Sequence, residues 1–147
     1  MAVRVEMTRN EKVILVTAGL VFHRGKLLIT QRPAGTHLAG MWEFPGGKQD
    51  PGETLPECLA RELREELGIE VEVHELLEEC VHSYPEKTVK LHFFRCTLKQ
   101  GEPRAIECSN FAWVTAEELD RYAFPPPDHS LLEALKHGAL TALFKQC

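Results

Sequence analysis

Residues 47–69, which read GKQDPGETLPECLARELREELGI, join a glycine-rich loop to a helix that carries more glutamate than a helix needs. Thr54 and Glu57 have the spacing of a capping box at the start of this helix. Pro56 suits its first turn, and Gly68 is a natural end for it. The sequence therefore predicts a helix that ends at Gly68, and the rest of the chain has to hold this loop and helix in place.

The leucines of this helix fall on one face. At 100° per residue they form an apolar stripe that consists of Leu55, Leu59, Leu63 and Leu67. Glu66 falls inside this stripe, Glu62 lies at its edge, and Glu65 flanks Glu62 on the other side. A solvated face is the usual explanation of a glutamate-rich helix, but solvated glutamates have no reason to enter a buried stripe, and crowded carboxylates repel one another. A divalent cation explains both observations, and carboxylate oxygens suit Mg²⁺ or Mn²⁺.

Two glycines, Gly46 and Gly47, come just before this segment's acidic residues. Glycine lets a backbone carbonyl approach a metal ion closely. The alternative is that the two glycines only form a tight turn. We expect Glu53 and Arg61 to form an ion pair that ties the loop to the helix, which places both in the candidate catalytic set.

The remaining chain alternates strands and helices. Apolar and alternating patterns predict strands at residues 13–21, 26–31, 41–44, 70–84, 88–98 and 110–114. A second capping box at 115–118 opens a short helix, and 130–144 is predicted as a final amphipathic helix. This order predicts an α/β fold, with a mixed β-sheet between helices in an α/β/α sandwich. Residues 1–147 are expected to form one domain, with 1–11 as a loose lead-in.

The composition is that of a soluble globular protein, with 44% hydrophobic and 27% charged residues. A net charge of −5 gives no basic footprint for a nucleic-acid polymer. No apolar run is long enough for a membrane span, and the N-terminus does not resemble a signal peptide. The five cysteines lack C-x-x-C spacing, so reduced thiols in the cytoplasm are expected; they are Cys58, Cys80, Cys96, Cys108 and Cys147.

Residues 47–69 fill every defined position of the Nudix box, G-x5-E-x7-R-E-L-x-E-E-x-G-I, so the chain resembles the Nudix family. Residues 31–33, the WEFPGG run at 42–47, Trp113 and the FPPPD segment at 124–128 resemble the MutT-like branch of that family. The resemblance implies a Nudix fold and Mg²⁺-dependent hydrolysis, with Mn²⁺ as a possible substitute. In this branch the substrate is usually a nucleoside triphosphate, and the products are a nucleoside monophosphate and diphosphate.

The resemblance also implies a metal site. Glu62 and Glu66 bind the metal together with the Gly46 carbonyl, and Glu65 contributes directly or through water. Glu107 stands where this branch places a further acidic ligand or base. Metal ions polarise a phosphate and lower the pKa of bound water, and a glutamate can then take the proton of that water. Glu62 is the first candidate for this base and Glu107 the second.

Seven residues are candidates for substrate binding, and they include Phe124 and Asp128, which are described in the next paragraph. Arg32 matches an arginine that contacts substrate phosphate in MutT-like proteins; the alternative is a surface arginine. Lys48 follows the glycines and could bind phosphate or simply be solvated. The resemblance places His37, Phe44 and Tyr84 around the base pocket, although Phe44 suits the core equally well.

Asp128 is the most informative single departure, because the resemblance to MutT itself implies Asn at this position. An ionised Asp only accepts hydrogen bonds, so it suits the amino group of cytosine or the N–H pair of guanine, whereas a protonated Asp can mimic Asn. Related enzymes that act on cytosine nucleotides resemble this chain in having Asp. The alternative role is the N-cap of the last helix, worth about 1 kcal/mol. Phe124 and the prolines at 125–127 hold Asp128 stiffly in either role.

The first expectation is thus a pyrophosphohydrolase that removes 8-oxo-dGTP or a related purine triphosphate from the nucleotide pool, and so supports DNA repair. The runner-up acts on CTP, dCTP or a methylated form. Hydrolysis of ADP-ribose or a dinucleotide is less favoured because extra elements for longer substrates are absent from the sequence. A different class is a non-catalytic nucleotide-binding module like the Nudix-like domain of adenine glycosylases, which usually lacks these carboxylates. The expected partner is a small nucleoside triphosphate, bound by a monomer or homodimer.

Overall fold

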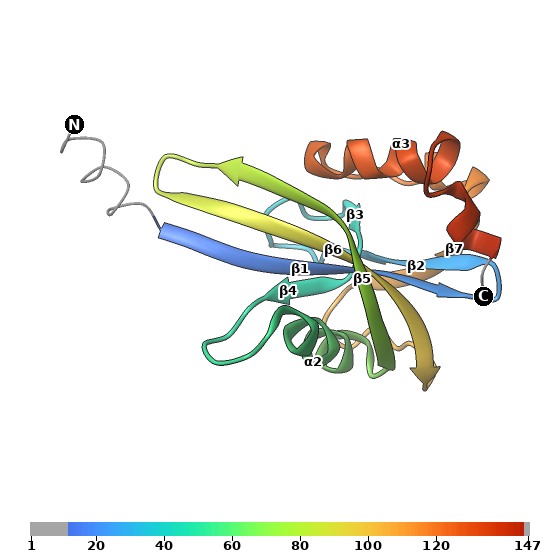
Figure 1. The fold of residues 1–147 in the computed structure, drawn as a ribbon, viewed down its shortest axis with the longest axis horizontal. Coiled ribbons are helices and arrows are strands. Elements are labelled where there is room, and N and C mark those ends of the chain that lie inside the picture. The colour runs from blue at the N-terminus through green and yellow to red at the C-terminus, as the bar shows by residue number, and fades with distance from the viewer. Residues whose placement is uncertain (1–11, 146–147) are drawn as a thin grey trace.

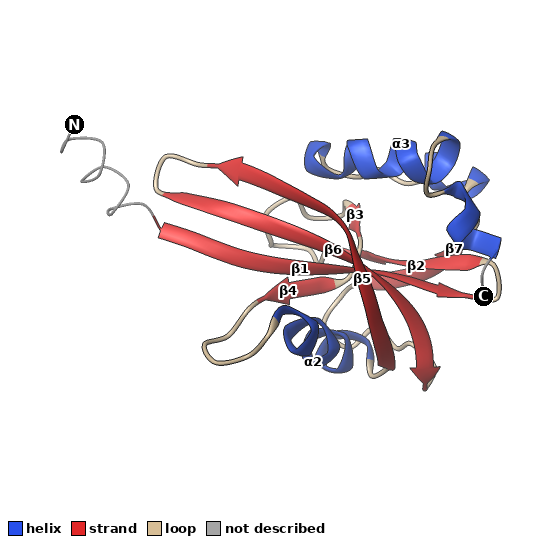
Figure 2. Cartoon of the chain, viewed as in Figure 1, coloured by secondary structure: helices blue, strands red, loops and turns tan. Residues whose placement is uncertain are grey.

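The computed structural model describes residues 12–145, so the expected lead-in at 1–11 lies outside the described residues. A twisted sheet carries a helix on each face (Figures 1 and 2). The strands are β1 (Lys12–His23), β2 (Lys26–Gln31), β3 (Trp42–Glu43), β4 (Gly46–Lys48), β5 (Glu70–Ser83), β6 (Lys87–Gln100) and β7 (Asn110–Val114). The helices are α2 (Leu55–Leu67) and α3 (His129–His137), with short 3-10 helices η1 (Glu117–Arg121), η2 (Pro126–Asp128) and η3 (Thr141–Lys145).

The sheet is mixed, as the sequence predicts. Its strand order is β3-β2-β1-β6-β5, with β4 paired to β1 and β7 paired to β2. β1 and β6 run parallel, from Lys12 opposite Lys87 to Phe22 opposite Thr97, and the other pairs are antiparallel. The helices α2 and α3 lie on opposite faces (Figure 1), so the α/β/α arrangement is confirmed.

Each face of the sheet has its own apolar core. On one face Leu59, Leu63 and Leu67 are fully buried against strand residues such as Val21 and Phe94, and Leu55 is only partly buried. On the other face, α3 and η3 pack against β1, β2 and β6 through a second cluster. The leucine stripe of α2 therefore lies where its spacing predicts.

Two local predictions were wrong. The helix predicted at 130–144 is interrupted: α3 ends at His137, and Gly138 adopts an extended conformation (φ −116°, ψ −150°) before η3 begins. Glycine resists helix more than other residues except proline, which explains the break. The alternative explanation of Gly46 and Gly47, that they only form a tight turn, was also wrong, because both belong to β4 and pair with the edge of β1.

Two further expectations concern the cysteines and membrane crossing. Within residues 12–145 the cysteines are all free, and they are Cys58, Cys80, Cys96 and Cys108. The described helices are too short or too polar to cross a membrane.

Candidate active site

The helix α2 begins and ends as its sequence predicts. The Glu57 N–H donates to the Thr54 hydroxyl at 3.2 Å, and the Thr54 N–H donates to the Glu57 carboxylate at 2.8 Å. Gly68 closes the helix with φ 72°, and its N–H bonds to the Arg64 carbonyl. The capping box and the glycine thus fix the axis of α2, and with it the positions of its glutamates.

Gly46 and Gly47 are required for close packing. A Cβ atom on Gly46 would overlap the Thr17 carbonyl, and one on Gly47 would overlap the carboxyl group of Glu62. Positive φ angles occur at other glycines of the described chain, so a tight turn is not the reason for these two. Their lack of a side chain lets β4 lie between β1 and the glutamates of α2.

The backbone of Gly46 faces these glutamates. Pro45 accepts a ladder hydrogen bond from β1 at 2.7 Å. Alternate residues of an antiparallel edge strand make such bonds, so Gly46 directs its N–H and C=O away from β1. Its N–H donates to the Glu66 carboxylate. The Gly46 carbonyl lies on the same side, as the expected metal contact requires.

Glu66 is 8% exposed, as expected for a glutamate inside the apolar stripe. Burial raises its pKa to about 8, and the charges of Glu43 and Glu62 add to this rise. Burial also raises the pKa of Glu62, although Arg61 acts in the opposite direction. The Glu107 N–H donates to the Glu66 carbonyl at 3.2 Å, which brings the loop after β6 to α2. Mutual repulsion and burial therefore disfavour the charged state of Glu62 and Glu66.

These residues fit a divalent cation in chemical type. A cation relieves both the repulsion and the burial cost of Glu62 and Glu66, and hard oxygen donors are what Mg²⁺ prefers. Within residues 12–145, no three acidic, histidine or cysteine side chains lie close enough as they stand to form a complete metal site. One Glu62 oxygen is instead bonded to Arg61 at 3.1 Å.

Arg61 connects the helix to the glycine loop. The predicted pair with Glu53 is confirmed by a contact of 2.8 Å, and the same guanidinium bonds the Lys48 carbonyl at 3.1 Å. It also contacts Glu62 and Glu65, each at 3.1 Å. Hydrogen bonds from Arg61 and the loop lower the pKa of Glu53 to about 2. Glu65 is exposed and lies on the outer side of this network.

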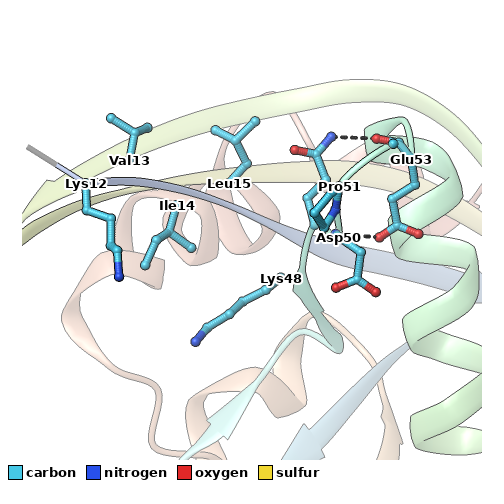
Figure 3. Close-up of a pocket in the computed structure, with 10 residues that line it drawn as sticks. Lys12, Val13, Ile14, Leu15, Lys48, Asp50, Pro51 and Glu53 are labelled. Carbon is cyan, nitrogen blue, oxygen red and sulfur yellow. Dashed lines mark hydrogen bonds between the residues drawn. The ribbon is translucent and has the colours of Figure 1, made fainter. Parts of the chain in front are cut away.

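Figure 3 shows the loop that Arg61 holds. The Gln49 amide donates to the Glu53 carbonyl at 2.8 Å, and the Asp50 N–H donates to the Glu53 carboxylate at 2.8 Å. The loop that these bonds hold forms one wall of a hollow of about 660 Å³, and the start of β1 forms the opposite wall. Lys12 and Lys48 extend into the same open space beside it (Figure 3).

A second hollow, of about 320 Å³, lies on the α3 side of the sheet. It brings together four of the expected substrate residues, Arg32, Phe44, Lys48 and Asp128, with both glycines of β4. The rest of the lining is largely apolar and consists of Val16, Ala18, Leu38, Glu43, Leu91, Phe93, Pro125 and Pro127. An apolar pocket with a few polar groups is typical of a small-molecule site.

Phe44 belongs to both the pocket and the core. It is buried, and its ring lies 5.3 Å from that of Phe124 and 6.1 Å from that of Phe93. Phe124 is also buried and supports Phe44 from behind, outside the lining that the described residues form. Both interpretations of Phe44 are therefore compatible with its position.

Asp128 stands at the N-cap position of α3, but within the described chain its side chain makes no capping hydrogen bond. It is 5% exposed and lines the hollow. Burial raises its pKa to about 7, and the charges of Glu43 and Glu78 act in the same direction. The capping role is thus not supported, and Asp128 can exist in either protonation state near neutral pH.

The structure places two expected pocket residues elsewhere. The His37 side chain is exposed, and its carbonyl accepts a hydrogen bond from Arg32 at 2.6 Å because the loop after β2 folds back on itself. Tyr84 is 42% exposed at the tip of the β5–β6 hairpin, which extends beyond the part of the sheet covered by helices (Figure 1). Its ring packs on His82 and Lys87. Neither His37 nor Tyr84 is in the lining that the described residues form.

Residues 17–134 match the family model of the NUDIX domain. The chain belongs to the Nudix family. It is 40% identical over 123 residues to the CTP pyrophosphohydrolase of Escherichia coli K12, covering 84% of this chain and 91% of that protein. It is 39% identical over 127 residues to an 8-oxo-dGTP diphosphatase of Haemophilus influenzae, covering 86% and 93%.

Solved structures agree with this Nudix assignment. The solution structure of the E. coli ORF135 protein superposes with a TM-score of 0.74 at 38% identity, covering 86% of this chain and 93% of that one. The crystal structure of a MutT protein from Methanosarcina mazei gives a TM-score of 0.74 at 27% identity, covering 84% and 92%. The expected family and fold are therefore confirmed.

Glu43 is a residue of this Nudix site that the sequence prediction missed. It is half-buried in the pocket lining and pairs with Arg32 at 3.2 Å. Burial raises its pKa, although Arg32 lowers it, and its charge affects both Glu66 and Asp128. The signal was a glutamate between two aromatic residues, Trp42 and Phe44, because an acid in an apolar strand needs a cationic partner.

Alanine is expected to change the free energy of unfolding by different amounts at the two glycines of β4. Gly47→Ala displaces only the end of the flexible Glu62 side chain, so the free energy of unfolding should change by about 1 kcal/mol or less. Gly46→Ala forces a Cβ into the backbone at Thr17 and should cost about 3 kcal/mol or more. Urea denaturation of both variants measures this difference, and equal losses would contradict the assignment.

The raised pKa of Glu66 predicts how stability depends on pH without metal. Folded Glu66 keeps its proton up to about pH 8, whereas the unfolded side chain loses it near the ordinary glutamate pKa of 4.5, so the free energy of unfolding should fall across this window. The limiting slope for one such group is about 1.4 kcal/mol per pH unit. Asp128 contributes only below about pH 7, so the slope between pH 7 and 8 reports on Glu66.

Urea denaturation in EDTA at pH values from 5 to 9 tests this. Glu66→Gln should remove the slope between pH 7 and 8, whereas Glu65→Gln, on the exposed side of the same helix, should keep it. Above pH 8 the buried thiols, whose pKa values are also raised, contribute equally in both variants. A slope that survives Glu66→Gln unchanged would show that another group carries the titration.

Proposed function

We propose that this chain is a Mg²⁺-dependent nucleoside triphosphate pyrophosphohydrolase, which releases a nucleoside monophosphate and diphosphate. One observation carries the proposal. Gly46 and Gly47 line the apolar pocket, and the same two residues contact the carboxylates of Glu66 and Glu62. A nucleotide in the pocket is thus separated from the acidic helix only by a backbone without side chains.

The residues of the chain have the following proposed roles. Glu62, Glu66 and the Gly46 carbonyl hold the ion, and Glu65 and Glu107 assist directly or through water. Bound Mg²⁺, or Mn²⁺ in its place, neutralises phosphate charge and supplies a water molecule of lowered pKa. Glu62, held by Arg61 at 3.1 Å, takes the proton of the attacking water, with Glu107 as the second candidate.

Arg61 and Glu53 keep the catalytic helix and the glycine loop in a fixed relation, because their ion pair spans the two. On the pocket side, Arg32 and Lys48 provide positive charge for the substrate phosphates. Arg32 is held at the pocket edge by Glu43 and by the His37 carbonyl, so its orientation is set before substrate binds.

The base is read by Asp128, between Phe44 and the prolines that precede α3. We favour 8-oxo-dGTP or a related purine triphosphate as substrate, because protonated Asp128 both donates and accepts, as an Asn does. The second candidate is CTP, dCTP or a methylated form, which ionised Asp128 suits. Both kinds of activity are named among relatives of about 40% identity. Tyr84 and His37 can reach the base only if the hairpin tip and the loop after β2 move.

A non-catalytic nucleotide-binding module is disfavoured because Glu62, Glu65 and Glu66 are all present on α2. We expect the enzyme to act on free nucleotides in the cytoplasm, as a monomer or homodimer.

The reaction is tested by pyrophosphate release from a panel of triphosphates with Mg²⁺. Glu62→Gln and Glu66→Gln should fold normally but reduce turnover by about 100-fold or more, since each removes a charge from the metal site. Glu117→Gln, an exposed glutamate on η1, is the control and should keep wild-type turnover. Full activity in both site variants would refute the mechanism, and tight nucleotide binding without any release would favour the binding module.

The role of Asp128 is tested by the ratio of kcat/KM for 8-oxo-dGTP to that for dCTP, measured from pH 6 to 8.5 with dGTP as a reference. Because the pKa of Asp128 is about 7, the ratio should fall as pH rises through that value. Titration of the metal site should change kcat/KM by the same factor for both substrates, so its effect cancels in the ratio. Asp128→Asn should make the ratio independent of pH, and a constant ratio in the wild type would exclude this mode of selection.

A further inference from the structure

Two buried side chains outside the expected site converge on the Gly47 carbonyl. The Thr17 hydroxyl of β1 donates to this oxygen at 3.3 Å, and the Cys58 thiol of α2 donates to it at 3.6 Å. Thr17 and Cys58 also contact each other at 3.4 Å. Thr17 is 1% exposed and Cys58 is 0% exposed. From the sequence, Thr17 was expected to lie in a strand and Cys58 to be a reduced thiol, and neither was expected to belong to the site.

The three contacts between Thr17, Cys58 and the Gly47 carbonyl depend on the hydrogens that the two side chains can donate. The hydroxyl and the thiol each carry one hydrogen, and the three contacts share these two hydrogens. Burial raises the pKa of the Cys58 thiol, which keeps it protonated and able to donate. A buried carbonyl that loses one of its donors is less well satisfied, and this loss is unfavourable even though Gly47 keeps Thr17 as its backbone partner in the sheet. The two donors therefore resist movement of Gly47 away from α2.

The same helix contacts Gly47 a second time. Glu62 lies four residues after Cys58, so both side chains project from one face of α2. Cys58 bonds the Gly47 carbonyl, and the Glu62 carboxyl group fills the space where a Cβ on Gly47 would lie. The distance between Gly47 and α2 thus determines where the Glu62 carboxylate can sit.

We propose that Thr17 and Cys58 are positioning residues of the hydrolase site, which hold the Gly47 carbonyl and so set the place of the Glu62 carboxylate. This inference rests on the proposed function. Thr17 and Cys58 are both buried behind β4, away from the pocket that the described residues form, so they reach the site through Gly47. The Cys58 sulfur also lies 4.0 Å from the Arg61 guanidinium, whereas the Thr17 hydroxyl has no such contact among the described residues. Residues that support metal ligands typically affect metal affinity or activity by about 10- to 100-fold.

Cys96 provides a matched control. It is fully buried, and its thiol lies on the same α2 face of the sheet. It donates only within its own strand, to the Phe94 carbonyl at 3.8 Å, among the contacts of the described residues. Cys96→Ala and Cys58→Ala thus remove the same atom from the same core, but only Cys58→Ala removes a donor to Gly47.

The experiment measures kcat and KM for pyrophosphate release, Mn²⁺ affinity by electron paramagnetic resonance, and the melting temperature. Cys58→Ala should lower kcat about tenfold or more and weaken Mn²⁺ binding, with KM within about twofold of wild type. Cys58→Ser, which keeps a donor, should recover most of both losses. Cys96→Ala should lower the melting temperature comparably and leave kcat and Mn²⁺ affinity unchanged.

Thr17 gives an independent series if Cys58→Ala does not fold. Thr17→Val should reproduce the loss of kcat and Mn²⁺ affinity, and Thr17→Ser should keep both. The double variant should lose less than the product of the single losses, because both side chains act on one carbonyl.

Wild-type kcat and Mn²⁺ affinity in Cys58→Ala and Thr17→Val would overturn the inference, as would an equal loss in Cys96→Ala. Failure of the proposed function is a separate result, since the wild type would then release no pyrophosphate. Mn²⁺ affinity would still decide whether Thr17 and Cys58 position Glu62.

Discussion

The close contact between β4 and α2 is the constraint on which the rest of the structure depends. It requires a strand without side chains, since any Cβ at Gly46 or Gly47 would overlap β1 or Glu62. It also requires that α2 be held from both sides. The leucine stripe buries the helix against β1 and β6, while Arg61 fixes its outer face to the loop through Glu53 and the Lys48 carbonyl.

Charge is distributed around this contact in two groups. On the α2 side, Arg61 faces Glu53, Glu62 and Glu65, while Glu66 is buried away from any arginine contact among the described residues. On the pocket side, Arg32 has Glu43 as its partner. Burial raises the pKa of Glu66 to about 8. The protein thus keeps one carboxylate without an arginine partner among the described residues, which gains most from a divalent cation, next to others that Arg61 contacts.

The sequence predicts what local spacing controls. The capping box at Thr54 and the end at Gly68 follow from short local motifs, and the leucine stripe and the burial of Glu66 follow from the 3.6-residue period; all four were confirmed. It also predicts the Nudix family, since the box is a contiguous motif. What it missed depends on distant partners. Asp128 is buried near Glu43 of β3 and Glu78 of β5, which are far from it in the sequence. The exposure of Tyr84 depends on the reach of the β5–β6 hairpin, and the ion pair of Glu43 depends on Arg32, which follows the neighbouring strand β2.

The two glycines of β4 form a partition one backbone thick between the pocket and the acidic helix. The residues proposed to contact a base line the pocket on the α3 side of the sheet, and the glutamates proposed to support hydrolysis lie on α2, on the other side. Substitutions at Phe44 or Asp128 can therefore change which nucleotide is chosen while α2 keeps its packing. The arrangement makes substrate choice and bond cleavage separately adjustable, so new specificities can arise in this chain without rebuilding its reaction centre.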